Sequence, residues 1–192
     1  MRIEAFVVAG ECKLLYYAAY RDTPIGCCKK HKEGTDMPFM SLDDAELWDL
    51  CPDNMKHAIQ GGVTGLAYFP MGEMKDNPAT VVALRMGPGC VLPRHGHDCH
   101  RFEIVVRGTL DVGDRVLKVG DIMVTEPNNV YGPHIAGPEG CTTFEIFSNH
   151  KGSHVVLFDL AQGIVECDVT TQEGLDKLQE AMREDAKMGA QA

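Results

Sequence analysis

The sequence lacks several features that mark common classes of protein. No apolar run approaches twenty residues, so we expect no membrane-spanning helix. The 18 Lys and Arg residues are outnumbered by 28 Asp and Glu and do not cluster, which argues against a nucleic-acid surface. The net charge of −10 also disfavours binding to an anionic membrane. A Gly-rich phosphate loop, a Ser-His-Asp order and a nucleophile elbow are absent as well.

Cysteine is present, but without the spacing of a zinc knuckle or a disulfide scaffold. The eight cysteines include no CxxC pair, and Cys27 and Cys28 are adjacent, a spacing at which residues rarely bridge. A chain of 192 residues is also long enough to bury a core without staples. The first residues make a poor signal peptide, because Glu4 and Glu11 interrupt the apolar stretch. We therefore expect reduced thiols in a cytoplasmic protein.

Three zones divide the chain. Residues 1–62 are irregular and predict strands and short helices, including one over "SLDDAELWDL", where Ser41 and Asp44 form a capping-box pattern. Residues 63–165 alternate short β-rich runs with Gly, Pro and Asn, which is typical of an antiparallel sandwich or barrel. Residues 166–192 predict an amphipathic helix, with Thr170 and Glu173 as its capping box. The prediction is one mainly β domain with helices at both ends.

The stretch "PRHGHDCHRFE", residues 93–103, holds three of the eight histidines. On a strand, His95 and His97 project from the same face, so both imidazoles can reach one ion about 2 Å away. A third histidine from a neighbouring strand would complete a site with open positions for water or substrate. Such a site suits Fe(II), Mn(II), Ni(II), Cu(II) or Zn(II), and affinity alone does not choose among them.

Two spaced motifs in residues 65–160 resemble those of the cupin superfamily. The first motif begins at Gly89, continues after five intervening residues with His95 and His97, and closes at Gly108. The second motif begins at Gly120 and Asp121, has its proline, Pro127, one residue later than the family pattern, and ends at His134. The resemblance implies a jelly-roll barrel, or double-stranded β-helix, that binds one divalent metal ion per chain through His95, His97 and His134. It implies much less about activity, because cupins serve many reactions.

One position departs from the first motif. Arg101 stands seven residues before Gly108, where the family usually has a metal-binding glutamate, and Glu103 follows two positions later. If the strand is regular, both side chains point into the barrel. Glu103 could then be the fourth ligand, or it could pair with Arg101 and leave a three-histidine site. On the same pattern His100 faces the other way.

Several other residues are candidates for lesser roles. Tyr131 could donate a hydrogen bond in the site or only pack, and an inward Arg101 would suit a substrate carboxylate. The "HKGSH" stretch places His150 and His154 four residues apart, and we expect an exposed loop there because Gly152 lies between them. Cys99 could be a redox thiol or a sulfur ligand and Glu126 could line the barrel mouth, but we expect a turn cysteine without a role and an exposed acid at a strand end. The apolar positions expected to form the pocket wall are Val105, Leu110, Met123 and Val124.

The sequence therefore predicts a metal-dependent cupin enzyme, of the dioxygenase type, that acts on a small organic molecule. The alternative is a non-catalytic cupin that binds a ligand or is stabilised by its metal, and the absent family glutamate favours it. A metal-independent sugar epimerase of the same fold is disfavoured by the His-x-His pair. We expect a homodimer in which residues 1–30 contribute to the contact, because their apolar strands have no local cover.

Overall fold

A computed structural model describes residues 39–189 of the chain. The strands expected within residues 1–30, and the dimer contact expected of them, lie outside the described residues. Within the described range, no helix is long and apolar enough to cross a membrane.

The larger of two sheets has seven strands, all paired antiparallel. Its main path runs β1-β2-β9-β5-β6, with β3 paired to β9 and β7 paired to β5. These strands are β1 (Val63–Pro70), β2 (Thr80–Met86), β3 (Val91–Leu92), β5 (Arg101–Asp111), β6 (Val116–Lys118), β7 (Ile122–Thr125) and β9 (His134–Phe147).

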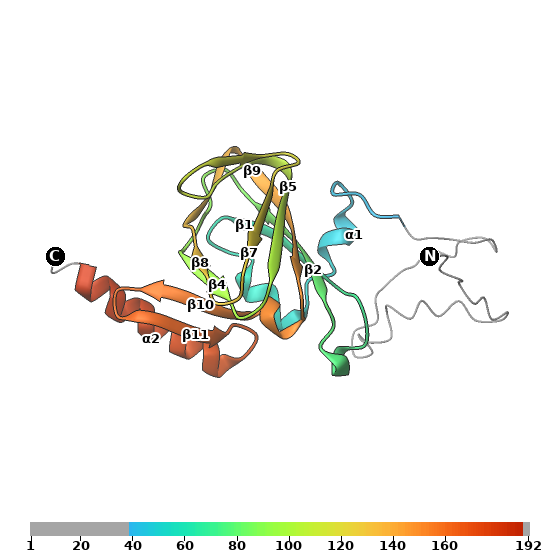
Figure 1. Cartoon of the computed structure of the whole chain (residues 1–192). Helices are drawn as coiled ribbons and strands as arrows, with labels where there is room; N and C mark the ends of the chain where they lie inside the picture. Colours follow the sequence, from blue (N-terminus) through green and yellow to red (C-terminus); the bar gives the residue numbers. More distant parts are fainter. Residues whose placement is uncertain (1–38, 190–192) are drawn as a thin grey trace.

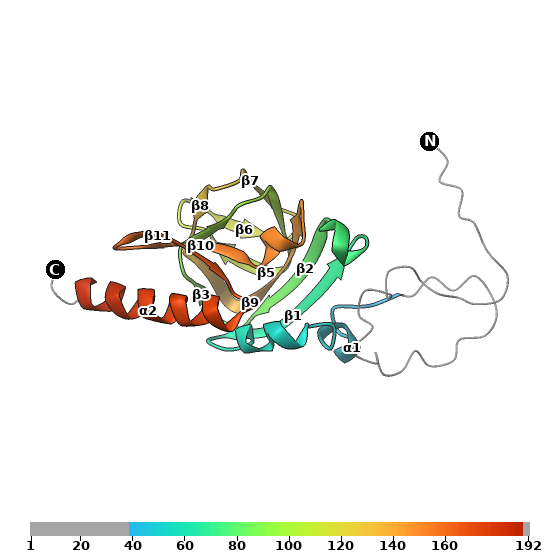
Figure 2. The same cartoon turned by 90° about the horizontal axis from the view of Figure 1, so that it is seen from below.

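The smaller sheet has four antiparallel strands in the order β11-β10-β4-β8. They are β4 (His95–His97), β8 (Val130–Tyr131), β10 (Val155–Leu160) and β11 (Gly163–Asp168). The strands of the two sheets curve around one axis to form a barrel, seen end-on in Figure 2. This architecture confirms the antiparallel double-sheet barrel predicted for residues 65–160.

Alternation along β5 decides what the barrel encloses. Arg101, Glu103 and Val105 are buried, whereas Phe102 between them is 45% exposed. Because side chains on a strand alternate between faces, these three side chains point into the barrel. The barrel interior therefore contains charged side chains beside apolar ones. The apolar part includes Met86, Val105, Leu110, Cys141 and Phe147.

Glycines allow the turns and close approaches of the barrel. Gly113 has φ of 100° and lies in the hairpin that pairs Asp111 with Val116, as the sequence predicts. Gly108, with φ of 71°, lies against the Gly140 carbonyl group, where a Cβ atom would be only 3.0 Å from the carbonyl carbon. A side chain at Gly108 would therefore separate β5 from β9.

Short helical segments and one longer helix surround the barrel (Figure 1). They are α1 (Ala45–Trp48), the 3-10 turns η2 (Asp53–Ala58), η3 (Met74–Asp76) and η4 (Lys151–Ser153), and α2 (Gln172–Gly189). The α1 helix and η2 turn confirm the helical segments expected after residue 40. In Figures 1 and 2, α2 runs alongside the β10–β11 hairpin.

The start of α2 corrects two expectations. Residues 166–168 belong to β11, so the helix begins at Gln172 and not near residue 166. The capping hydroxyl is that of Thr171, which accepts a hydrogen bond from the Gly174 amide at 3.1 Å. Thr170 instead donates its hydroxyl to Asp168 Oδ1 at 2.6 Å. The hydroxyl group of Thr170, which the sequence pattern predicted to cap the helix, is therefore bonded to the Asp168 carboxylate.

Candidate metal centre

The three histidines of the two motifs come together inside the barrel. His95 and His97 lie on β4, and His134 begins β9 next to Leu92 of β3. The ring centroid of His95 is 5.6 Å from that of His97 and 5.9 Å from that of His134. All three side chains are buried. The fold thus joins the His-x-His pair to a histidine that follows it by almost forty residues.

Backbone carbonyl groups fix the tautomers of His95 and His97. The Nδ1 atom of His95 lies 2.7 Å from the carbonyl oxygen of Pro93, and that of His97 lies 2.7 Å from the carbonyl oxygen of Gly152. A carbonyl oxygen can only accept, so each Nδ1 carries a proton and donates it. The neutral ring then has its lone pair on Nε2. Metal-binding histidines commonly show this arrangement.

Burial keeps these imidazoles neutral. It lowers the pKa of His95 to about 4, and it lowers the pKa of His97 well below its ordinary value, with the charge of Arg101 adding to both effects. A neutral imidazole is the form that binds a metal ion.

His134 is enclosed without a hydrogen bond to either ring nitrogen. Its Nδ1 atom lies 3.5 Å from Oε2 of Glu103, which is too long for a good hydrogen bond but suitable for orienting the ring. Burial lowers the pKa of His134 to about 4. A buried polar ring without partners requires an explanation, and a bound ion is one.

Arg101 occupies the interior at the motif position of the family glutamate. Its Nε atom donates to Oε2 of Glu145 at 2.8 Å, and its Nη2 atom lies 2.9 Å from Oε2 of Glu103 without the angle of a hydrogen bond. Burial alone would lower the pKa of Arg101, but the two carboxylates raise it above its ordinary value. The guanidinium is therefore a permanent charge beside the three histidines.

Glu145 is a site residue that the sequence analysis missed. It lies on β9 directly opposite Glu103 of β5. The available signal was a charged residue in the apolar run "TTFEIF", two positions before the buried Phe147. Its partner, however, depends on the register between two distant strands.

Tyr131 lies against the same cluster. Its ring centroid is 4.8 Å from that of His95, and its ring stacks on His134 with centroids 5.1 Å apart. The Arg101 guanidinium carbon lies 4.8 Å from the centre of the tyrosine ring. Burial raises the pKa of Tyr131 above its ordinary value, and its buried hydroxyl has no hydrogen-bond partner. The phenol is thus a neutral donor within the site.

The three imidazoles are suitable ligands for a divalent ion, although they are not yet arranged around a single metal position. Among residues 39–189, no three His, Cys, Asp or Glu side chains already converge as a metal-binding group. Binding would require the three imidazoles to direct their Nε2 atoms to one point. Their fixed tautomers and the two unpaired nitrogens of His134 are what support such a site.

Other candidates from the sequence lie elsewhere. His100 is on the surface, 3.2 Å from Glu126, as strand alternation predicts. Val105 and Leu110 are fully buried, and Met123 packs against the core. Val124, however, is 60% exposed and does not line the interior. It follows Met123 on β7 and so points to the opposite face.

The "HKGSH" stretch also differs from expectation, because it is not an exposed loop. His150 and His154 flank the η4 turn, and their ring centroids are 5.3 Å apart. Gly152, which argued against a helical turn, lies buried against Cys99 in the middle of it. The pair lines a cavity of about 220 Å³ separate from the three interior histidines.

Comparison with known proteins gives structural neighbours only. No protein-family model and no curated protein sequence matches the chain. Among solved structures, KdgF from a Halomonas species is 20% identical, covers 48% of this chain and 84% of its own, and has a TM-score of 0.40. An RmlC-like cupin from Shewanella frigidimarina is 22% identical, with 50% and 85% covered and a TM-score of 0.42.

An oxalate decarboxylase variant from Bacillus subtilis is also similar. It is 16% identical over 49% of this chain and 26% of its own, with a TM-score of 0.41. Each of these likenesses covers half of this chain or slightly less. The fold class itself rests on the strand pairing described above, which agrees with the cupin resemblance of the two motifs.

Proposed function

We propose that the protein is a metal-dependent cupin enzyme in which His95, His97 and His134 hold one divalent transition-metal ion. The observation that carries this proposal is the fixed protonation of His95 and His97 on Nδ1, which leaves both Nε2 lone pairs for an ion. Structural histidines in a core usually use both ring nitrogens. Here a third buried ring, that of His134, has no hydrogen bond at either nitrogen.

Of the two roles open to Glu103, we propose that it orients His134 and neutralises Arg101, and that it is not a ligand. Its Oε2 atom is already 2.9 Å from the Arg101 guanidinium and 3.5 Å from His134 Nδ1. A carboxylate at the second of these positions favours a proton on Nδ1 of His134. All three histidines would then offer Nε2.

Arg101 and Tyr131 are the proposed substrate-binding residues. The Nη1 atom of Arg101 and the hydroxyl of Tyr131 are buried donors without partners. A guanidinium and a neutral phenol together suit a carboxylate or another oxygen-rich group of a small molecule. The bound ion would supply Lewis-acid or redox chemistry, and dioxygenation is the reaction that we propose to test first.

One observation favours a second candidate, a non-catalytic cupin that binds a small ligand. Arg101 takes the position of the family glutamate, so the proposed site has one protein ligand fewer. Its charge also faces the three histidines, whose pKa values it lowers. Native metal identity separates the candidates, because iron with oxygen consumption supports the enzyme, whereas retained zinc without turnover supports the binding protein.

The test of the metal centre is elemental analysis of identically purified variants. We expect about one ion per chain in the wild type from this site, and loss of it in His95→Ala, His97→Ala and His134→Ala. Glu103→Gln should retain the ion if the carboxylate only orients and neutralises. The matched control is His100→Ala, which removes an exposed histidine from the same stretch. Equal metal content in the wild type and all three interior variants would contradict the proposal.

A further inference from the structure

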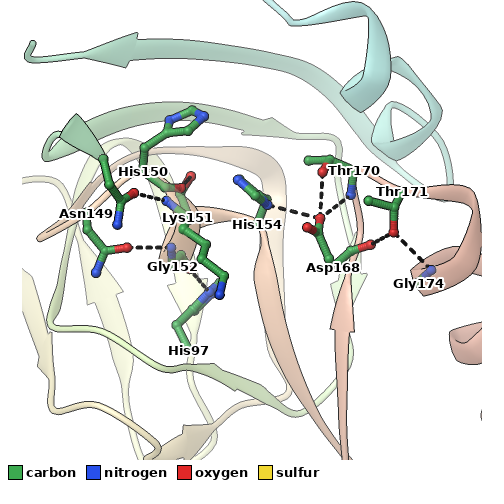
Figure 3. A network of polar contacts seen from close by, with 12 residues as sticks. His97, Asn149, His150, Lys151, Gly152, His154, Asp168, Thr170, Thr171 and Gly174 are labelled. Carbon is green, nitrogen blue, oxygen red and sulfur yellow. Dashed lines mark hydrogen bonds and ion pairs between the residues drawn. The ribbon is translucent and has the colours of Figure 1, made fainter. Parts of the chain in front are cut away.

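A second pair of histidines lies on the opposite side of the turn that supports the metal centre. Figure 3 shows His150 and His154 on one side of η4 and His97 on the other, where it contacts Gly152. The turn is closed by hydrogen bonds from the Ser153 amide to the His150 carbonyl and from the His154 amide to the Lys151 carbonyl. The imidazole ring centroids of His150 and His154 are 5.3 Å apart, so the turn places both rings on the same side.

Oxygen acceptors fix the tautomer of His154. Its Nδ1 atom lies 3.0 Å from Oδ1 of Asp168, and the same oxygen accepts from the amide and the hydroxyl of Thr170 at 2.9 and 2.6 Å (Figure 3). The carboxylate is thus held in place by two other donors. A neutral histidine oriented by a fixed carboxylate through Nδ1 has its Nε2 lone pair free for a ligand.

The same reasoning applies to His150. Its Nδ1 atom lies 3.0 Å from the hydroxyl oxygen of Thr80, and that hydroxyl donates to the Pro78 carbonyl at 3.3 Å. When the hydroxyl donates to that carbonyl group, its oxygen accepts from Nδ1 of His150 and the Nε2 atom keeps its lone pair. Burial lowers the pKa of His150 to about 4, so the ring is neutral near pH 7.

Both rings line a cavity of about 220 Å³ between η2 and η4. None of its other lining residues carries a carboxylate; they are Pro52, Asn54, Met55, Tyr68, Met74 and Thr170. Two imidazoles beside thioether groups are a donor set for borderline ions, not for Mg²⁺ or Ca²⁺, which require oxygen ligands.

We propose that His150 and His154 form a second metal-binding site, separate from the barrel centre, for a borderline divalent ion such as Zn²⁺. The two Nε2 atoms are the protein ligands, and Asp168 and Thr80 position them. The remaining positions open into the cavity, so the bound ion is accessible to water or a small molecule. The inference does not rest on the proposed function of the barrel centre.

The experiment is a Zn²⁺ titration of the full chain, freed of metal with a chelator, in a His95→Ala/His134→Ala background. This background removes two of the three interior histidines and keeps the contact of His97 with Gly152 in the η4 turn. We expect one equivalent of Zn²⁺ binding to be lost when His150→Gln or His154→Gln is added, with affinity falling at least about 100-fold. Asp168→Asn should weaken binding by roughly 10–100-fold without abolishing it.

Controls address folding and other ligands. Gln is chosen because it retains an amide donor and similar bulk, and the thermal unfolding of each variant shows whether it is folded. His100→Ala in the same background should leave the titration unchanged. Cu²⁺ bound in place of Zn²⁺ should give an electron paramagnetic resonance spectrum with coupling to two nitrogens. Unchanged Zn²⁺ binding in folded His150→Gln and His154→Gln proteins, or a Kd above about 1 mM in the background protein, would overturn the proposal.

Discussion

The Nη2 atom of Arg101 lies 2.9 Å from Oε2 of Glu103, and both side chains are enclosed within the barrel. Glu145 adds a second carboxylate, whose Oε2 accepts from Arg101 Nε at 2.8 Å. One guanidinium between two carboxylates carries a net negative charge when all three are ionised. The cluster therefore offsets the repulsion that Arg101 alone would exert on a cation held by the neighbouring histidines.

Removal of the guanidinium should be strongly destabilising. Arg101→Met leaves Glu103 and Glu145 buried without their cation, and breaking a buried pair in this way costs about 3–5 kcal/mol. The measurement is the free energy of unfolding in denaturant at neutral pH. The control is Arg101→Met/Glu103→Gln/Glu145→Gln, which removes the charges together and should recover much of the loss. A single variant as stable as the wild type would show that the ion pairs do not form.

The turn at Gly152 should couple barrel stability to metal retention. A Cβ atom at Gly152 would lie 2.8 Å from Cβ of Cys99 and 3.0 Å from a carboxylate oxygen of Asp98. Gly152→Ala must therefore displace these side chains or shift the turn whose carbonyl group holds His97, at a cost of about 1–3 kcal/mol. We expect lower stability and lower metal content by unfolding and elemental analysis.

Cys99→Ala provides the control for the Gly152 prediction. Combined with Gly152→Ala, it removes the sulfur atom that the new methyl group meets most closely, so the two changes should cost less together than the sum of their separate effects. Strictly additive losses would mean that the methyl group does not act through Cys99.

The metal-free protein should lose stability in mild acid. Burial lowers the pKa of His95, His134 and His150 from 6.5 to about 4. The unfolded chain therefore binds protons below pH 6.5 that the folded chain does not accept until about pH 4. Stability contributed by the neutral rings is complete above pH 6.5 and decreases as the pH falls toward 4. Urea unfolding across this range measures the slope.

Two comparisons test the pH prediction further. His150→Gln removes one of the three groups and should reduce the slope, whereas His100→Ala removes an exposed histidine and should leave it nearly unchanged. Stability that is flat between pH 7 and pH 4 in the metal-free wild type would show that these imidazoles are not enclosed.

Asp168 should contribute stability with its own dependence on pH. Burial raises the pKa of this carboxyl, but hydrogen bonds from Thr170 and the contact with His154 outweigh burial and lower it below 3.8. The contribution is therefore present above pH 3.8 and is lost as the pH falls through the lower folded value. We expect Asp168→Asn to be less stable than the wild type at pH 6, with the difference narrowing toward pH 3 in urea unfolding.

The hydroxyl group of Tyr131 should contribute to the proposed site but not to the stability of the fold. The buried hydroxyl has no hydrogen-bond partner, so Tyr131→Phe removes an unsatisfied group and retains the ring against His134 and Arg101. We expect unchanged or slightly higher thermal stability, whereas Tyr131→Leu should lose about 1–2 kcal/mol through the ring contacts. A clear loss of stability in Tyr131→Phe would reveal a partner for the hydroxyl.

The sequence alone determined the features that depend on local spacing. Strands recur at short intervals because Gly, Pro and Asn interrupt β-rich runs, and this pattern predicted the antiparallel barrel. The spacing of His95 and His97 placed both rings on one face, and Gly113 marked its hairpin, because each depends only on neighbours in the chain. The alternation of β5 likewise turned Arg101 and Glu103 inward and Phe102 outward.

Only the tertiary structure decided the features that depend on which distant segments meet. Glu145 reaches Arg101 through the register of β9 with β5, and the carbonyl group of Gly152 reaches His97 across more than fifty residues. The cavity beside His150 and His154 likewise depends on distant segments, because its lining residues come from η2, β1, η3 and the residues after β11. A periodic pattern shows that a side chain is turned inward, but long-range pairing chooses its partner and hence its chemistry.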